Sequence, residues 1–275
     1  MPRRLCAAGR LLRVVVHGLH GVAVVLVRFP SLDAASRRAR VGWWSRGMLE
    51  RLGIALRVEG DPRTAPGTLL VVNHVSWLDI MAVHAVAPEA RFVSKADVRR
   101  WPIVRRLVDA GGTLYLERER KRDALRVVRD VAAALSTGDT VAVFPEGTTS
   151  TGHGLLPFHA NLLEAAVSAG APARPVALRW SDAEHAVSEA VEFIGDTTLL
   201  ESLWRTANGL GVVVTLRFLA PRAAGVGGAG DRRALAGALR ADIAAALGVD
   251  AAPTGRRGDP SWGSPSPSPP PRPPG

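Results

Sequence analysis

The chain has 275 residues, of which 47% are apolar, so it can bury a sizeable core in one large domain and is not disordered as a whole. Its formal net charge of +10 favours an anionic partner, either nucleic acid or a phospholipid surface. The single cysteine, Cys6, excludes an internal disulfide framework and a cysteine-rich zinc site.

The first predicted element is a helix over the apolar run Leu11–Val27, which follows the basic residues Arg3 and Arg4. A helix of this length covers about 25 Å, slightly less than the hydrocarbon core of a bilayer. No small-residue cleavage site follows the run. We therefore predict an uncleaved helix that lies in, or barely enters, the membrane, with its arginines toward the cytoplasm. An ordinary core helix is the alternative.

A second helix is predicted from about Ser31 to Leu52, where four arginines accompany Trp43 and Trp44. Arginine and tryptophan together are typical of the headgroup level of a membrane, although the tryptophans could equally pack on the core. We expect residues 1–53 to form membrane-associated helices.

From Ile54 onward, short β-rich runs alternate with helical patterns. The expected strands are Leu69–Val72, Thr113–Leu116, Thr140–Phe144, Arg174–Leu178 and Gly211–Phe218. The clearest helical patterns are Arg122–Leu135, Leu162–Ser168 and Arg232–Leu247. This alternation predicts an α/β domain over residues 54–250, with a mainly parallel sheet flanked by helices, which binds ligands at the carboxyl ends of its strands. Residues 251–275, rich in proline, are expected to be a disordered tail.

The first motif with chemical potential is Asn73–Asp79, directly after the expected strand. Histidine is the usual general base near neutral pH, and a carboxylate on its other nitrogen fixes its tautomer. Residues five apart in one helix face away from each other, so His74 must lie on the strand-to-helix turn and Asp79 in the first helical turn, with Ser76 as the N-cap. Ser76 and Asp79 also resemble a capping box, which would make Asp79 structural.

The second motif, Phe144–Ser150, follows another expected strand. Gly147 and the neighbouring hydroxyl residues would let backbone N–H groups approach a phosphate or an oxyanion. A plain strand-ending turn is the alternative.

The third motif, Gly111–Arg118, is a strand that ends in an arginine suited to a phosphate. The charged residues that follow Arg118 would by default lie on a solvated helix start.

In this order and spacing, the segments resemble the lysophosphatidate acyltransferase family, the glycerophospholipid acyltransferases with an N-H-x-x-x-x-D block. Asn73, His74 and Asp79 match the first family block, and Phe144–Thr148 matches the third. The resemblance implies that His74 is the general base and that Asp79 orients it.

The resemblance extends from about Leu69 to Trp180 and assigns further roles. Arg118 falls where the family's second block has its phosphate-binding arginine, and Pro175–Leu178 falls at the fourth block. The acceptor-binding residues implied by the third block are Glu146, Gly147, Thr148 and Thr149.

The chain departs from the family pattern at two places. Thr149 replaces the arginine of the usual Gly-Thr-Arg-Ser sequence, and Phe158–Asn161 replaces the usual Phe-Lys-x-Gly, so two cations are missing. Both changes resemble the subgroup that acylates lyso-ornithine lipids, as well as some bacterial lysophosphatidate enzymes.

The resemblance implies transfer of an acyl chain from acyl-CoA or acyl carrier protein to the hydroxyl of a lysolipid at the cytoplasmic face of the inner membrane. The expected acceptor is 1-acyl-sn-glycerol-3-phosphate, with lyso-ornithine lipid as the alternative. We expect no metal, no cofactor and no covalent acyl-enzyme. A basic nucleic-acid-binding protein and a non-enzymatic membrane scaffold are remote alternatives, because no nucleic-acid-reading motif is present and both His74 and Asp79 are.

Overall fold

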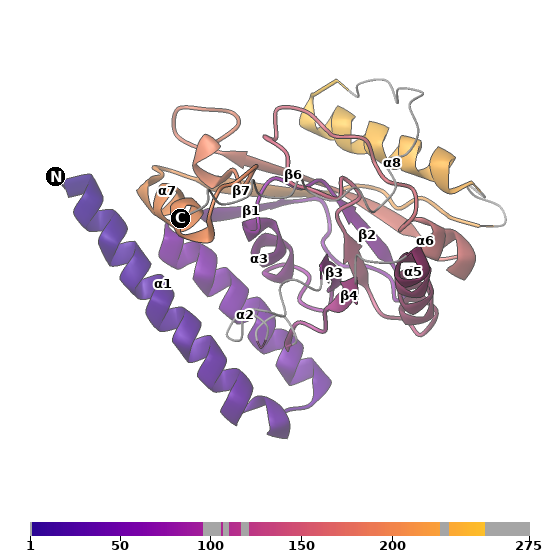
Figure 1. The fold of residues 1–275 in the computed structure, drawn as a ribbon, viewed down its shortest axis with the longest axis horizontal. Helices are drawn as coiled ribbons and strands as arrows, with labels where there is room; N and C mark the ends of the chain where they lie inside the picture. Colours follow the sequence, from indigo (N-terminus) through magenta and orange to yellow (C-terminus); the bar gives the residue numbers. More distant parts are fainter. Residues whose placement is uncertain (1, 96–105, 107–109, 117–120, 226–230, 251–275) are drawn as a thin grey trace, which may run out of the picture.

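A computed structural model describes residues 2–95, 106, 110–116, 121–225 and 231–250. Two long helices, α1 (Pro2–Val27) and α2 (Ala34–Leu52), precede the sheet and are joined by the short 3₁₀ helix η1 (Phe29–Ser31). They form a hairpin beside the α/β body (Figure 1). The proposed tail and the second-block residue Arg118 lie outside the described residues.

The sheet has seven strands in the described part of the chain, in the order β1-β7-β6-β2-β5-β3-β4. Their bounds are β1 (Ala55–Glu59), β2 (Leu69–Val72), β3 (Arg91–Lys95), β4 (Leu114–Leu116), β5 (Val141–Val143), β6 (Ala173–Ser181) and β7 (Val213–Phe218). The pairs among β6, β2, β5, β3 and β4 are parallel, whereas β7 is antiparallel to β6 and parallel to β1. The prediction of a mainly parallel sheet flanked by helices is confirmed, with two reversed strands at one edge.

Alternate side chains of β2 divide the core into two layers. Leu69 and Val71 pack with α5 (Lys121–Ser136), α6 (Glu164–Ala169) and α8 (Arg232–Leu247), whereas Leu70 and Val72 pack with α2 and α3 (Leu78–His84). All four side chains are fully buried, which is the near-continuous apolar pattern of a strand covered on both faces. The central strand is therefore rigidly held, and the residues that follow it have a fixed position.

Several element boundaries differ from the sequence predictions. Helix α1 begins at Pro2, well before the apolar run, and α2 begins at Ala34 because the Asp33 side chain accepts a hydrogen bond from Ser36 N at 2.7 Å. Strands β1 and β3 and the helix α7 (Leu199–Asn208) were not predicted from the sequence.

The hairpin of α1 and α2 is held by reciprocal hydrogen bonds. The indole of Trp44 donates to His17 O at 3.1 Å, and the His17 ring bonds Trp44 O at 2.9 Å while stacking on the indole. Gly21 permits this approach, since a Cβ there would lie 2.3 Å from Trp44 Nε1. Trp44 therefore packs between the helices, whereas Trp43 remains 48% exposed.

Helix α1 is the one described helix that is long and apolar enough to cross a membrane, over Arg3–Val27, and only 17% of its most apolar window is buried. Its length and composition are also those of a signal sequence. The exposed apolar side chains of α1 include Leu12, Val16 and Leu19.

Candidate active site

The first motif lies where β2 ends, between the carboxyl ends of its two neighbours β6 and β5. Asn73 continues the strand with its side chain, donating to Leu178 O at 2.9 Å and accepting from Leu178 N at 2.8 Å. These two bonds replace the backbone hydrogen bonds that β2 would otherwise make to β6, at the point where the backbone of β2 leaves the sheet. His74 is thereby placed on the strand-to-helix turn, as predicted.

His74 and Asp79 form a hydrogen-bonded pair, with Nδ1 of the ring 2.8 Å from Oδ2 of the carboxylate. The His74 side chain is 18% exposed, whereas Asp79 is fully buried in the first turn of α3. Because Nδ1 is directed at the carboxylate, Nε2 is the ring nitrogen left for a substrate hydroxyl. The predicted contact between the two residues is confirmed.

The Asp79 carboxylate also holds the turn itself. Oδ2 accepts from the backbone N–H groups of Val75 at 2.7 Å and Ser76 at 2.9 Å. One carboxylate oxygen therefore contacts the histidine ring and also makes the carboxylate half of the predicted capping box, the bond from Ser76 N. The prediction that Ser76 is the N-cap was wrong: Trp77 occupies that position, and the Ser76 hydroxyl only accepts from Leu78 N at 3.4 Å.

Trp180 completes the set of donors around Asp79. Its indole donates to Oδ1 at 2.7 Å, and the ring is 1% exposed. Strand β6 makes this possible because Val72 at the end of β2 pairs with Val176, so β6 continues past the turn. Trp180 was not among the site residues predicted from the sequence. A buried indole N–H is normally hydrogen-bonded, so a tryptophan on a strand next to the fourth block indicates that an acceptor lies nearby. The sequence does not indicate which residue that acceptor is.

The third motif packs on His74 from the other side. Glu146 is 2% exposed, and its two carboxylate oxygens accept from His74 N at 2.7 Å and Leu156 N at 2.9 Å. Burial raises the pKa of Glu146, and the two backbone hydrogen bonds oppose this shift. Ser150 donates to His74 O through its backbone N–H at 2.8 Å. The loop after β5 therefore fixes both backbone polar groups of the histidine.

The ring of His74 is positioned by an aromatic contact. It stacks on Phe144 with centroids 4.0 Å apart and an interplanar angle of 11°, and Phe144 in turn lies 5.4 Å from Phe92. This stack, together with the carboxylate on Nδ1, restricts the imidazole to one plane. Such preorganisation lowers the cost of aligning a base with the proton it removes.

The remaining residues of the third motif lie in the same loop. Gly147 has φ of 70°, and a Cβ there would come 3.1 Å from the His159 ring, so glycine is needed both for the turn and for this approach. Thr148 is exposed. Thr149 donates its hydroxyl to Phe193 O. Thr149 thus ties the segment after β6 to the motif loop.

The candidate phosphate-binding residue Arg118 lies outside the described residues. Strand β4, which precedes Arg118 in the chain, is the edge strand of the sheet.

We expect Trp180→Phe to lower kcat about tenfold with little change in KM, because the change removes one donor from the carboxylate that orients His74. Trp44→Phe is the matched control, since it also removes one indole N–H donor, but at the helix hairpin. Steady-state kinetics with thiol release as the signal would check this. Equal losses of kcat in the two variants would show that Trp180 acts only through general stability.

A histidine oriented by a buried carboxylate, with one nitrogen open beside a glycine-containing loop, defines a site for activating a hydroxyl group. Residues 55–179 match the family model described as Acyltransferase. The chain is 36% identical over 260 residues to a lyso-ornithine lipid O-acyltransferase of Pseudomonas aeruginosa, covering 93% of this chain and 97% of the relative. It is also 36% identical over 217 residues to a 1-acyl-sn-glycerol-3-phosphate acyltransferase of Neisseria meningitidis, covering 78% and 84%.

The crystal structure of the 1-acyl-sn-glycerophosphate acyltransferase PlsC from Thermotoga maritima has the same fold, with a TM-score of 0.63 at 21% identity, over 87% of this chain and 96% of that one. The protein therefore belongs to the acyltransferase family of these lysolipid-acylating enzymes.

Proposed function

We propose that this protein transfers an acyl chain from acyl-CoA or acyl carrier protein to the free hydroxyl of a lysolipid. The single observation that carries the proposal is the His74–Asp79 pair, 2.8 Å apart, with Nε2 facing away from the carboxylate. Nε2 takes the hydroxyl proton as the lipid oxygen forms a bond to the thioester carbonyl carbon. When the tetrahedral intermediate collapses, the C–S bond breaks and the thiolate takes the proton back from His74.

This mechanism is a direct transfer without a covalent acyl-enzyme, a metal or a cofactor. Asp79 stabilises the imidazolium that forms during attack, and its own charge is shared among four hydrogen-bond donors. The Gly147 N–H already donates to Phe144 O at 3.1 Å, so the neighbouring Thr148 N–H is the backbone donor proposed for the oxyanion.

The acceptor we propose first is 1-acyl-sn-glycerol-3-phosphate, which would give phosphatidate. The complete first block and the position of Arg118 in the second block support it, as does the similarity to the Neisseria enzyme over most of its length. A phosphate monoester carries nearly two negative charges and is normally bound by more than one cation.

Lyso-ornithine lipid is the second candidate, and Thr149 favours it. The Thr149 hydroxyl is committed to Phe193 O, so the third block offers a neutral, already bonded side chain where relatives offer an arginine. The relative from Pseudomonas aeruginosa that carries this name matches over 97% of its length.

The decisive assay gives purified protein both lysolipids in parallel, each with acyl-CoA and with acyl carrier protein. We expect turnover of lysophosphatidate with at least one donor. Turnover of lyso-ornithine lipid alone would replace the first acceptor by the second. No turnover of either lipid with either donor would contradict the proposed function.

The variants Thr149→Arg and Thr149→Val separate charge from the lost hydrogen bond. Both remove the contact with Phe193 O, but only arginine adds a cation. For a phosphate acceptor, we expect kcat/KM of the arginine variant to equal or exceed that of the valine variant. A zwitterionic acceptor predicts the reverse, because the new charge has no partner. Measuring kcat/KM for both acceptors in both variants gives the answer, and identical values in the two variants would show that position 149 does not contact the acceptor head.

We also propose that the site works at the cytoplasmic face of the inner membrane. The long exposed apolar face of α1 and the formal charge of +10 support this placement.

A further inference from the structure

Helix α7 carries an apolar face that the protein leaves uncovered. Leu200 is 74% exposed and Trp204, one turn further, is 44% exposed. Ser202 and Thr206 on the opposite face are fully buried, so the helix is anchored by its small polar side and presents its large apolar side outward. Single exposed apolar residues are common, but a leucine and a tryptophan on one helix face form a candidate contact surface.

This face is fixed to the beginning of α1. Arg10 donates to Ala207 O at 2.9 Å and to Gly209 O at 2.8 Å, and Arg3 donates to Asn208 O at 3.1 Å. These carbonyls lie at the C-terminal end of α7, where backbone acceptors lack helical partners and cations are favourable. The two helices therefore form one unit at the N-terminal end of α1 (Figure 1).

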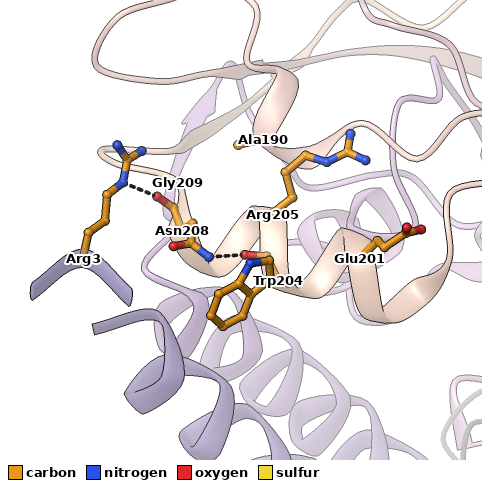
Figure 2. A pocket seen from close by; sticks show the side chains of 7 residues that line it. All are labelled: Arg3, Ala190, Glu201, Trp204, Arg205, Asn208 and Gly209. Atoms are coloured by element: carbon orange, nitrogen blue, oxygen red, sulfur yellow. Dashed lines mark hydrogen bonds between the residues drawn. The ribbon is translucent and has the colours of Figure 1, made fainter. Parts of the chain in front are cut away.

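A pocket of about 500 Å³ lies between the two helices. Arg3 reaches into it from α1, while Trp204 and Arg205 line it from α7 (Figure 2). Two exposed guanidinium groups beside an indole are the combination that occurs at the headgroup level of membranes, where phosphates meet arginine and indole rings lie at the polar boundary. Glu201 also lines the pocket, and its hydrogen bonds to Thr198 together with the charge of Arg205 lower its pKa, so it stays ionised. Among the lining residues, two arginines still outnumber this one carboxylate.

Helix α7 is also connected to the catalytic turn. The indole of Trp77, two residues before Asp79, donates to the Ser202 hydroxyl at 3.1 Å. In addition, the Thr206 hydroxyl donates to Ala190 O at 3.1 Å, in the segment after β6 that also contacts the motif loop. Hydrogen bonds therefore link α7 both to the turn that carries Asp79 and to the segment that contacts the motif loop.

We propose that α7 and the first turns of α1 form a docking surface for a bilayer that contains anionic phospholipids. Leu200 and Trp204 enter the boundary between headgroups and acyl chains, and Arg3 and Arg205 contact lipid phosphates at the pocket. A single apolar helix can attach a protein to a membrane without fixing its orientation. A second contact, tied to Trp77, orients the site toward the bilayer. The role of this surface in orienting the active site rests on the proposed function, whereas its binding to the bilayer does not.

The test uses the full chain and its co-sedimentation with vesicles of phosphatidylglycerol and phosphatidylethanolamine. Leu200→Glu should lower the vesicle partition coefficient about tenfold, because it removes a leucine that the bilayer would bury and adds a charge that anionic lipid repels. Leu125→Glu is the matched control: Leu125 is a 61% exposed leucine on α5, a helix on the other layer of the fold. Both residues are exposed, so neither change should disturb folding, and thermal melting checks this.

The expected result is a loss of binding for Leu200→Glu and none for Leu125→Glu. Equal partitioning of Leu200→Glu and the wild type, or an equal loss in both variants, would overturn the docking surface. Arg205→Gln should weaken binding to the anionic vesicles but not to vesicles of phosphatidylcholine alone. An equal effect on both vesicle types would overturn the role of the pocket.

Activity distinguishes this inference from the proposed function. With lysolipid dispersed in detergent, Leu200→Glu should turn over at the wild-type rate, whereas with lysolipid in vesicles its rate should fall with its binding. If no variant transfers an acyl chain but the binding difference remains, the acyltransferase proposal fails and the docking surface stands. If activity is present and binding does not change, the reverse holds.

Discussion

His74→Ala is expected to lower kcat/KM for acyl transfer by about 10²–10⁴-fold, the usual cost of losing a general base. The fold should persist, because the side chain is partly exposed and the elements around it are held by β2, β5 and β6 rather than by the imidazole. Thiol release from the acyl donor measures the rate, and thermal melting measures stability.

The chain offers a matched control for this change. His185 also bonds an aspartate through Nδ1, at 3.0 Å from Asp182, but its side chain is 61% exposed and belongs to the turn after β6. His185→Ala should leave the rate unchanged. More than a tenth of wild-type activity in His74→Ala would disprove the mechanism.

Asp79→Asn is expected to reduce both activity and stability. To keep accepting from Val75 N and Ser76 N, the new amide must place its oxygen at the position of Oδ2. Its NH₂ group then faces the indole N–H of Trp180, which now lies 2.7 Å from a carboxylate oxygen. A buried donor against a donor costs about 1–3 kcal/mol of folding free energy. The imidazole also loses the charge that stabilises its protonated form, so we expect at least a 10²-fold loss of kcat.

The double variant Asp79→Asn/Trp180→Phe separates these two effects. Removing the indole N–H relieves the conflict, so the double variant should unfold less easily than the sum of the single changes indicates, without regaining activity. Chemical denaturation and kinetics on all four proteins complete the cycle. If Asp79→Asn lowers stability but spares the rate, Asp79 is a capping residue and the catalytic dyad is refuted.

The loop after β5 shows where family resemblance alone is incomplete. The resemblance assigns Glu146 and Thr149 to acceptor binding, and that assignment stays a prediction. In the structure, both side chains are bonded to the protein's own backbone, Glu146 to His74 N and Thr149 to Phe193 O. Each side chain therefore holds a backbone segment of the site in place, and this contact is independent of any contact with the acceptor.

The sequence by itself determined the features that depend on neighbouring residues. The apolar run of β2, the turn at His74 and the placement of Asp79 in the first turn of α3 follow from local pattern and helix geometry. The alternation of strands and helices likewise determined a mainly parallel α/β sheet. The N-cap of α3 shows the limit of such local prediction. A shift of one residue in where the turn ends moves the cap from Ser76 to Trp77.

Only the tertiary structure decided which distant residues surround the dyad. Trp180 is separated from Asp79 by 101 residues, and Glu146 from His74 by 72. These contacts depend on the register of β6 and β5 against β2, and on how far each strand runs past its neighbour. The reversal of β7 against β6 and the docking of α7 on α1 were hidden for the same reason. Strand direction and helix packing are set by long-range burial, which a short stretch of sequence does not encode.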